Sequence, residues 1–343
     1  MNDAALAFTA PRTVERRPIT VSEPAADEVL VETRVSAISA GTELLVYRDQ
    51  LPSDLAADET LEAIEGDFSF PVEYGYAAVG EIRAVGSDVD EHWWGETVFG
   101  FVPHRTRFCA RPESLVRVPP ALTDVDAALL PTLETATNLV LDAQPRLGER
   151  VVVFGAGVVG LCTLRLLASF PLESLVVVEP LEHRREIARE FGADRAVSPA
   201  ALAAETNDGH ADVTDDAIGD ADLAIELAGD PSALDDAIGA VGYDARIVVG
   251  SWYGTKRAPI DFGGRFHRDR IELVSSQVST VDPSLRGRWD TDRRLETALE
   301  WVARLETAAL VTHRIPFRDA EDAYELLDSG PESALQVLLT YDE

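Results

Sequence analysis

The stretch VVVFGAGVVG, residues 151–160, decides the fold prediction. Four apolar residues typical of a buried strand lead into a Gly-x-Gly-x-x-Gly pattern, and an apolar helical segment follows at Leu161–Ala168. The first glycine permits a tight turn, the second lets the backbone approach a pyrophosphate, and the third allows the helix to pack closely on the strand. A helix N-terminus that faces the anion completes a dinucleotide-binding loop. We therefore expect the cofactor to contact Gly155, Gly157, Val158, Val159 and Gly160.

The next predicted strand, Leu175–Val178, ends at Glu179. A carboxylate there accepts hydrogen bonds from the adenosine ribose hydroxyls and repels the 2′-phosphate of NADP, which favours NAD. Arg184 and Arg185, on the following helix, could neutralise that phosphate, so NADP stays the alternative cofactor. The competing interpretation is that the loop is only a tight turn and Glu179 only a solvated strand end.

The predicted secondary structure changes near Thr123. Before it, short β-prone runs broken by turn residues predict an all-β domain, with strands at 28–35, 79–85, 97–101 and 115–118. After it, helical stretches alternate with apolar strands at 151–154, 175–178, 223–227, 246–249 and 271–274. This alternation predicts an α/β fold with a doubly wound parallel sheet covered by helices. Segment 53–70 is interpreted as a surface insertion or flap, and segment 200–222 as a surface helix and loop.

The C-terminal part predicts two helices with a strand between them. Leu295, Leu299 and Val302 fall on one helical face. Asp319 can cap a second helix that runs to Leu327 before Gly330, and residues 310–315 look like a strand.

Composition restricts the class of protein. The 343 residues are 46% hydrophobic, enough for two packed cores. The chain has 61 acidic and 30 basic residues, a net charge of −31, and Lys256 as its only lysine, which suggests a salt-loving cytoplasm. This negative field disfavours nucleic acid and membrane surfaces. The two cysteines, Cys109 and Cys162, exclude a four-cysteine zinc site, and neither a secretory signal nor a membrane-spanning run is present, so we expect a cytoplasmic location.

Three further stretches resemble the zinc-type medium-chain dehydrogenase/reductase (alcohol dehydrogenase-like) family over nearly the whole chain. Residues 35–43 (VSAISAGTE) resemble its Gly-Ile-Cys-Gly-Thr-Asp segment, residues 70–80 (FPVEYGYAAVG) its Phe-Pro-x-x-x-Gly-His-Glu-x-x-Gly segment, and residues 311–317 (VTHRIPF) the strand before its last helix. The resemblance implies a Rossmann domain with a GroES-like β-barrel catalytic domain. It implies a catalytic domain at 1–135, a dinucleotide-binding domain at 136–275 and a C-terminal return at 276–343. The oligomeric states that are usual in this family imply a homodimer or homotetramer.

The departures from the family pattern concern its zinc sites. Ala40 stands at the position of the zinc-binding cysteine, and Tyr76-Ala77 replaces the zinc-binding His-Glu pair. The pattern resembles a zinc-depleted branch that includes bacteriochlorophyllide dehydrogenase-like proteins. We therefore expect no metal ligands and no zinc. Nothing in the spacing of Glu134, His104 and Cys109 supports a rebuilt zinc site.

Another group must then stabilise the charge that develops on the substrate oxygen during hydride transfer. The resemblance suggests Thr42 as a hydroxyl proton relay, or alternatively a turn residue. Tyr76 is either a proton donor or a residue that fills the vacated space. Glu134 is either a buried proton acceptor with a raised pKa or an acid that stabilises a helix N-terminus.

Gly250, Ser251 and Trp252 follow the fourth strand of the predicted sheet, where the chain passes the nicotinamide, and Trp252 or Tyr253 is a candidate wall of the substrate pocket. We expect His313 to be packed or at the surface and Cys162 to lie in the core. The predicted function is NAD(P)-dependent hydride transfer between the nicotinamide and a small alcohol or carbonyl substrate without conventional catalytic zinc. The alternatives are a metal-free enoyl or quinone reductase and an inactive dinucleotide-binding protein.

Overall fold

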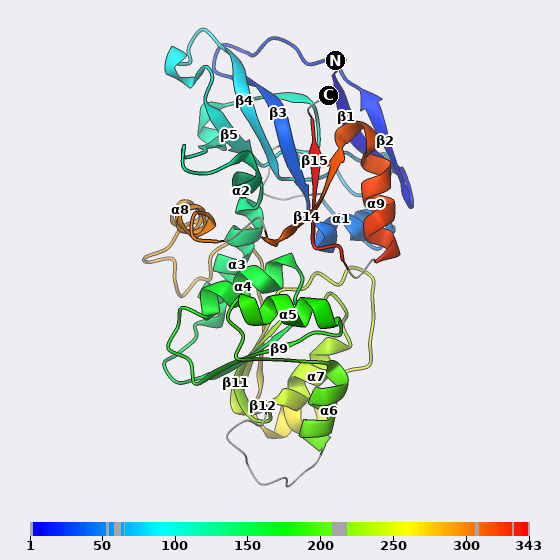
Figure 1. Cartoon of the computed structure of the whole chain (residues 1–343), viewed down its shortest axis with the longest axis vertical. Coiled ribbons are helices and arrows are strands. Elements are labelled where there is room, and N and C mark those ends of the chain that lie inside the picture. Colours follow the sequence, from blue (N-terminus) through cyan, green and yellow to red (C-terminus); the bar gives the residue numbers. More distant parts are fainter. Residues whose placement is uncertain are drawn as a thin grey trace. The chain divides into compact units, whose positions relative to one another are not determined.

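The computed structural model describes residues 3–52, 55–57, 63–64, 66–207, 218–305, 309–330 and 333–341. The chain forms two compact units (Figure 1). Unit 1 contains Met1–Pro131 and Leu299–Glu343, and unit 2 contains Thr132–Ala298. The domain boundaries predicted at 135 and 275 stay predictions. No helix within the described residues is long and apolar enough to cross a membrane.

Unit 2 is built on a six-stranded sheet in the order β10-β9-β8-β11-β12-β13. All its strand pairs are parallel. The order reverses beside β8, the first strand along the chain, as in a doubly wound sheet. The strands are β8 (Arg150–Phe154), β9 (Ser174–Val178), β10 (Arg195–Val197), β11 (Ala221–Glu226), β12 (Val241–Val249) and β13 (Glu272–Ser275). The five predicted strands of this unit are all present, and the short β10 was not predicted.

Helices cover the sheet of unit 2 (Figure 1). They are α4 (Val158–Leu167), α5 (Glu182–Glu190), α6 (Pro199–Asn207), α7 (Ala233–Ala240) and the kinked turn η3 (Phe262–Phe266). Val152 and Phe154 of β8 pack with Leu202 of α6 and Leu234 of α7 in one buried cluster. The helices α3 (Leu130–Ala143) and α8 (Thr291–Val302) carry the chain from one unit into the other.

Unit 1 contains a seven-stranded sheet in the order β14-β15-β3-β4-β5-β7, with β6 also paired to β3, and a separate hairpin of β1 and β2. The strands are β1 (Ala4–Ala10), β2 (Thr13–Pro18), β3 (Val29–Ile38), β4 (Ala78–Val85), β5 (Thr97–Gly100), β6 (Arg107–Ala110), β7 (Leu115–Arg117), β14 (Val311–Pro316) and β15 (Gln336–Thr340). The C-terminal β15 pairs antiparallel with β3, so the end of the chain completes the N-terminal sheet.

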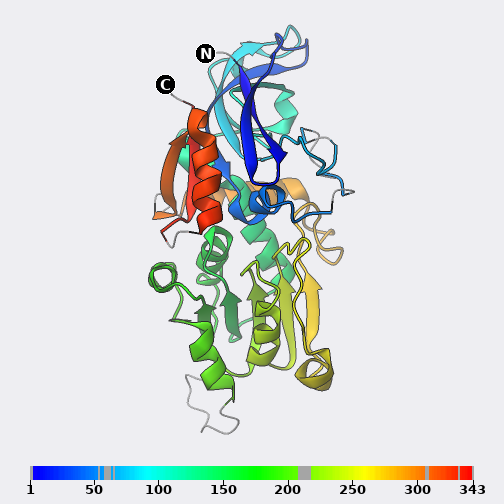
Figure 2. The ribbon, with the colours of Figure 1, turned by 90° about the vertical axis from the view of Figure 1, so that its right-hand side faces the viewer.

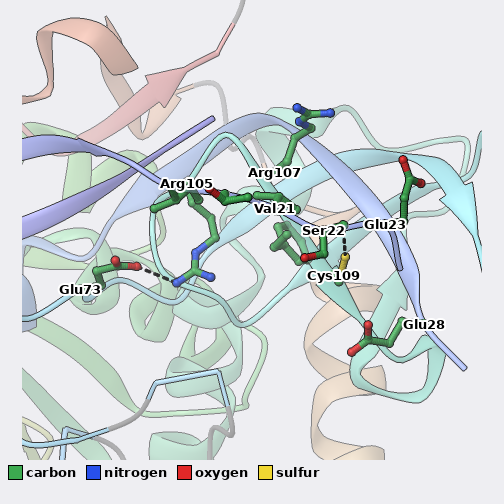
Figure 3. A pocket seen from close by; sticks show the side chains of 11 residues that line it. Val21, Ser22, Glu23, Glu28, Glu73, Arg105, Arg107 and Cys109 are labelled. Atoms are coloured by element: carbon green, nitrogen blue, oxygen red, sulfur yellow. Dashed lines mark hydrogen bonds and ion pairs between the residues drawn. The ribbon is translucent and has the colours of Figure 1, made fainter. Parts of the chain in front are cut away.

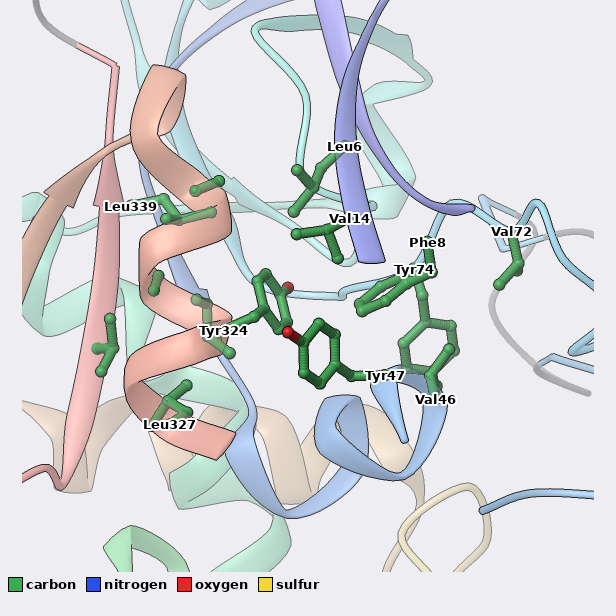
Figure 4. Packing of buried hydrophobic residues seen from close by; sticks show 14 of the residues in the cluster. Leu6, Phe8, Val14, Val46, Tyr47, Val72, Tyr74, Tyr324, Leu327 and Leu339 are labelled. Atoms are coloured by element: carbon green, nitrogen blue, oxygen red, sulfur yellow. The ribbon is translucent and has the colours of Figure 1, made fainter. Parts of the chain in front are cut away.

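The helices of unit 1 are α1 (Ala40–Tyr47), α2 (Asp124–Ala128) and α9 (Ala320–Ser329), with the single turns η1 (Glu91–Trp93), η2 (Pro112–Ser114) and η5 (Phe317–Asp319). Helix α9 lies beside β14 and β15 (Figure 2). Its Tyr324 is fully buried, packs edge-on against Phe8 at 5.2 Å between ring centroids, and stacks on Tyr47 at 5.6 Å (Figure 4). Burial of such large side chains contributes about 1.5–3 kcal/mol each, which fixes α9 to α1 and β1.

The structure can be compared with the predictions for the ends of α9 and for segments 53–70 and 200–222. Asp319 stands at the N-cap of α9 but makes no side-chain capping bond, so that part of the prediction is wrong, whereas Gly330 ends the helix at φ 64° as expected. Segments 53–54, 58–62 and 65 of the predicted flap and 208–217 of the predicted helix and loop lie outside the described residues. The described Ala57, Ile64 and Phe68 are buried in the core of unit 1, so this part of the segment packs into the unit.

Candidate functional site

The glycine loop after β8 has the geometry that its sequence demands. Gly155 has φ 96°, and a Cβ there would lie 2.6 Å from the carbonyl oxygen of Leu227. A Cβ on Gly160 would lie 2.1 Å from the carbonyl oxygen of Gly155. In contrast, a Cβ on Gly157 meets no atom within 4 Å. Gly155 and Gly160 therefore allow the turn and its close packing. Gly157 leaves the surface of the loop open.

The first turn of α4 presents backbone donors. Gly157 is its N-cap and provides no side-chain cap. The first amides of a helix have no partner within the helix, and the helix dipole places positive charge at this end. The backbone at Val158 and Val159 is thus suited to an anion such as a pyrophosphate.

Glu179, which directly follows β9, is buried and holds this loop. Its Oε2 accepts a hydrogen bond from the amide of Ala156 at 2.8 Å, and its Oε1 accepts one from the amide of Leu181 at 3.0 Å. Each carboxylate oxygen has a second lone pair for a ribose hydroxyl. The solvated strand end considered above is wrong, because the side chain is only 4% exposed. Contact with the ribose stays a prediction.

Arg184 and Arg185 of α5 have different surroundings. Arg185 donates from Nη1 to the carbonyl oxygens of Glu179 and Pro180 at 2.6 and 2.7 Å and pairs with Glu182. Arg184 is half-buried on the same helix. Arg185 is thus committed to neighbouring backbone and to Glu182, and a contact of either arginine with a 2′-phosphate stays a prediction.

The segment after β12 contacts the segment after β11. Ser251 Oγ accepts a hydrogen bond from the amide of Gly229 at 2.9 Å, and a Cβ on Gly250 would lie 2.6 Å from side-chain carbons of Leu139 and Leu227. Trp252 is 42% exposed, so it is not an ordinary core residue. These contacts keep the predicted nicotinamide segment at the carboxyl end of the sheet.

Sequence reasoning missed Glu226, the last residue of β11. Its fully buried carboxylate accepts a hydrogen bond from Tyr253 Oη at 2.5 Å and one from the amide of Ala228 at 2.7 Å. Burial raises the pKa of Glu226 and, together with this carboxylate, raises the pKa of Tyr253. An acid at the end of an apolar strand is the signal used for Glu179, and it could have identified Glu226 as well.

In unit 1, three hydroxyl groups meet. Tyr76 Oη donates a hydrogen bond to Ser39 Oγ at 2.5 Å and lies 3.3 Å from Thr42 Oγ1. Ser39 is the N-cap of α1 but makes no side-chain capping bond, which leaves its hydroxyl for Tyr76. We call Ser39, Thr42 and Tyr76 the hydroxyl cluster. The sequence had indicated Thr42 and Tyr76 separately, and it had not singled out Ser39.

The residues around the hydroxyl cluster do not fit a zinc ion. Ala40 and Ala77 have no donor atoms, and the Tyr76 hydroxyl is bonded to Ser39. Across the described part of the chain, no three His, Cys, Asp or Glu side chains gather as a metal-binding group. His104 and Cys109 have separate partners, Glu43 and the Ser22 carbonyl oxygen.

Glu134 lies in the second turn of α3 and forms a buried ion pair. Arg294 donates to its Oε1 from Nη2 at 2.7 Å and from Nε at 3.2 Å, and to Asn138 Oδ1 at 2.8 Å. Burial raises the pKa of Glu134, and Arg294 opposes that rise. The first turn of α3 contains no acid, so the helix N-terminal interpretation is wrong. A proton-accepting role stays a prediction.

A cavity of about 420 Å³ in unit 1 is lined by charged side chains (Figure 3). Arg105 pairs with Glu73 at 2.8 Å, and Arg107 pairs with Asp3 at 2.6 Å. None of the hydroxyl-cluster residues lines this cavity, and its arginines are neutralised by neighbouring acids.

The remaining candidates have structural surroundings. Cys162 is fully buried, and burial raises the pKa of its thiol to about 12, as expected of a core residue. His313 is half-buried on β14, and its Nδ1 lies 2.9 Å from Thr312 Oγ1. Neither contributes to the sites described above.

Comparison with known proteins agrees with this architecture. Residues 158–303 match the family model "Zinc-binding dehydrogenase". The chain is 25% identical over 331 residues to D-guloside 3-dehydrogenase of Escherichia coli K12, covering 92% of this chain and 93% of that protein. It is 25% identical over 356 residues to 2-desacetyl-2-hydroxyethyl bacteriochlorophyllide A dehydrogenase of Cereibacter sphaeroides, covering 98% of both.

A solved structure gives the same fold. The short chain alcohol dehydrogenase (rspB) from E. coli CFT073, complexed with NADH, superposes with a TM-score of 0.76 at 20% identity, covering 99% of both chains. The parallel sheet of unit 2 and the antiparallel sheet of unit 1 are thus a Rossmann domain and a GroES-like domain. The chain is thus similar to the zinc-binding dehydrogenases over residues 158–303 and shares the fold of the NADH-complexed alcohol dehydrogenase over 99% of its length.

Proposed function

We propose that the chain is an NAD(P)-dependent oxidoreductase that transfers hydride between the nicotinamide and an alcohol or carbonyl substrate without a conventional catalytic zinc. The observation that carries the proposal is the hydroxyl cluster at the vacated zinc positions, where Tyr76 lies within hydrogen-bond distance of Ser39 and Thr42. The match of residues 158–303 to the zinc-binding dehydrogenase model and the similarity to two dehydrogenases support the reaction type.

The phosphate loop binds the cofactor in this proposal. Its open Gly157 and uncapped α4 suit the pyrophosphate, and Glu179 suits the adenosine ribose. We propose NAD as the preferred form because the Glu179 carboxylate would repel a 2′-phosphate. The bound cofactor would supply or accept the hydride.

The hydroxyl cluster handles the proton. Reduction of a carbonyl adds a hydride to carbon and a proton to oxygen, and alcohol oxidation removes both. We propose that Tyr76 donates this proton and that Ser39 and Thr42 stabilise the resulting phenolate by donating their hydroxyl hydrogens to it. In the reverse direction the Tyr76 phenolate accepts the proton from the alcohol and becomes the phenol.

The test is a panel of alcohols, ketones and enones with NADH and NADPH and their oxidised forms, assayed in high salt. We expect turnover of an alcohol and carbonyl pair. Tyr76→Phe should lower kcat by roughly 100-fold while cofactor affinity is unchanged, because general acid catalysis is typically worth 10²–10⁴-fold. Thr42→Val tests the second hydroxyl in the same assay.

Other outcomes would replace the proposal. Turnover of enones alone would favour a conjugated C=C reductase, and cofactor binding without turnover would favour an inactive dinucleotide-binding protein. Metal analysis of the active enzyme that finds stoichiometric zinc would contradict the zinc-free part.

We further propose that the protein acts as a homodimer or homotetramer in a salt-rich cytoplasm. The composition supports the salt-rich setting, with a net charge of −31 and one lysine. Edge strand β13 supports assembly, because its Leu273 is 36% exposed and an unpaired sheet edge is a template for a second copy. Light scattering after gel filtration in high salt measures the oligomeric state, and a monomer would contradict it.

A further inference from the structure

Unit 1 buries a network of polar side chains that the proposed reaction does not use. It centres on Glu43 of α1, which is 0% exposed. A carboxylate is costly to bury unless hydrogen bonds replace its water. We call the set the Glu43 network, and its members are Ser36, Glu43, His104, Tyr324 and Tyr341.

Glu43 is satisfied by three donors. Its Oε1 accepts a hydrogen bond from the amide of Ser39 at 2.7 Å. Its Oε2 lies 3.0 Å from His104 Nε2 and accepts a hydrogen bond from the hydroxyl of Tyr324, which projects from α9 into the core of unit 1 (Figure 4). Burial, reinforced by Glu43, raises the pKa of Tyr324 well above its usual value and so keeps the phenol a donor.

The carboxylate of Glu43 determines the direction of the hydrogen bonds of His104. Because a carboxylate only accepts hydrogen bonds, the hydrogen of His104 is assigned to Nε2, where it points at Glu43. The other ring nitrogen, Nδ1, lies 2.7 Å from Ser36 Oγ, which lies 2.9 Å from Tyr341 Oη. Nδ1 then accepts a hydrogen bond from Ser36, and Ser36 Oγ accepts one from Tyr341.

Two connections join this network to the hydroxyl cluster. The first is Ser39, because Glu43 holds its backbone amide while its side chain receives the Tyr76 hydrogen bond. The second is Gly75, which precedes Tyr76 and has φ 115°. A Cβ on Gly75 would lie 2.6 Å from Cδ2 and Nε2 of His104, so the imidazole packs against this backbone. Glu43 and His104 therefore support both partners of the 2.5 Å Tyr76–Ser39 bond.

We propose that Glu43 and His104 are positioning residues that hold Ser39 and the Gly75–Tyr76 backbone so that the Tyr76 hydroxyl meets Ser39. The proposal rests on the proposed function of the hydroxyl cluster. Glu43 acts through the Ser39 amide, and His104 acts through its packing on Gly75 and its hydrogen bond to Glu43. Neither is a proton donor to the substrate.

The test compares Glu43→Gln with Tyr341→Phe. An amide offers one oxygen and one NH₂, so the Glu43→Gln side chain must place a donor against either the Ser39 amide or His104 Nε2. Tyr341→Phe removes a buried hydrogen bond at the far end of the network and keeps the ring stacked on Phe317 at 4.6 Å. Both variants lose a buried polar contact, but only the first disturbs Ser39 or His104.

We expect Glu43→Gln to lower kcat by roughly 10- to 100-fold with KM changed less than about threefold, because misplacement of a catalytic group by ~1 Å costs about 10²-fold. Tyr341→Phe should lower the melting temperature and leave kcat near that of the wild type. Equal kcat in both variants would overturn the proposal. If Glu43→Gln does not fold, His104→Gln replaces it with the same expectation.

A readout independent of turnover separates this proposal from the proposed function. The seven tyrosines accept fluorotyrosine, and comparison with Tyr76→Phe assigns the Tyr76 ¹⁹F resonance. We expect this resonance to move in Glu43→Gln and His104→Gln and to stay in place in Tyr341→Phe. An unmoved resonance in the first two overturns the positioning role. A wild type without turnover overturns the proposed function, and the resonance still decides the positioning.

Discussion

At the scale of residues, the clearest prediction concerns Arg294, whose charge compensates a buried carboxylate. The side chain of Arg294 is only 2% exposed, and that of Glu134 is 10% exposed. Replacing Arg294 by Met would leave the Glu134 carboxylate without its cation. We expect Arg294→Met to lower the free energy of unfolding by roughly 3–5 kcal/mol at neutral to alkaline pH, as for other buried ion pairs that lose one partner.

The pH dependence of this loss has a definite sign. Burial raises the pKa of Glu134 in the folded state, and Arg294 lowers it again. A carboxyl whose folded pKa exceeds its unfolded value stabilises the protein at low pH, and this contribution is lost as pH rises through the folded pKa. Arg294→Met raises that pKa further, so the loss of stability should be larger at about pH 8 than at about pH 5.

Urea unfolding at both pH values measures this effect. The double variant Glu134→Gln/Arg294→Met is the matched control, because it has no buried carboxylate that lacks a cation. It should recover part of the stability at high pH. An equal loss for Arg294→Met at both pH values would contradict the assignment.

At the scale of elements, we expect one glycine of the loop to be needed for stability and another for cofactor binding. Gly160→Ala should destabilise unit 2, because its Cβ would meet the Gly155 carbonyl oxygen at 2.1 Å and the backbone must shift. Gly157→Ala should change the free energy of unfolding by less than about 1 kcal/mol, since its φ of −72° suits any residue and its Cβ meets nothing within 4 Å. Its methyl group would nevertheless stand where the pyrophosphate approaches.

Thermal unfolding and titration with NADH by fluorescence distinguish the two variants. We expect a lower melting temperature for Gly160→Ala and a normal one for Gly157→Ala, with weaker NADH binding in the latter. Wild-type affinity in Gly157→Ala would remove the loop from the cofactor site.

Glu179 supports the same loop and bears on cofactor choice. Its two oxygens accept hydrogen bonds from the Ala156 and Leu181 amides. We expect Glu179→Ala to weaken NAD binding by roughly 10- to 100-fold, as hydrogen bonds to charged groups contribute about 1.5–3 kcal/mol. NADP binding should weaken less, because the repulsion of its 2′-phosphate is also removed.

Calorimetric titration with both cofactors measures this difference, and Glu179→Gln, which keeps one acceptor oxygen, serves as the control. Equal losses for NAD and NADP would assign the carboxylate to loop support alone.

The sequence separation between elements explains which parts of the fold and of the site could be predicted. The parallel sheet and its glycine loop were predictable because strand, turn and helix follow one another within residues 151–168. The bond between Tyr76 and Ser39 joins residues 37 positions apart, and Glu43 meets Tyr324 across 281 positions. The first contact depends on how β3 pairs with β4, and the second depends on how α9 returns to the N-terminal part of the unit. No local pattern indicates them.

At the scale of the whole molecule, repulsion among carboxylates competes with folding. The chain has 61 acidic and 30 basic residues, so most acids have no basic partner to balance them. Many described ion pairs lie at the surface, such as Arg111 with Asp27 and Arg270 with Asp244. Exposed pairs contribute little, about 0–1 kcal/mol each, and do not offset a net charge of −31.

Salt shortens the range of this repulsion from ~10 Å at 0.1 M to ~3 Å at 1 M, and the compact state gains more than the expanded one. We expect the melting temperature to rise by about 5 °C or more between roughly 0.1 and 1 M KCl. Sucrose at matched osmolality is the control, because it stabilises folded proteins by exclusion and does not screen charge. A melting temperature that is flat in KCl, or that rises equally in sucrose, would show that carboxylate repulsion does not limit the stability of this protein.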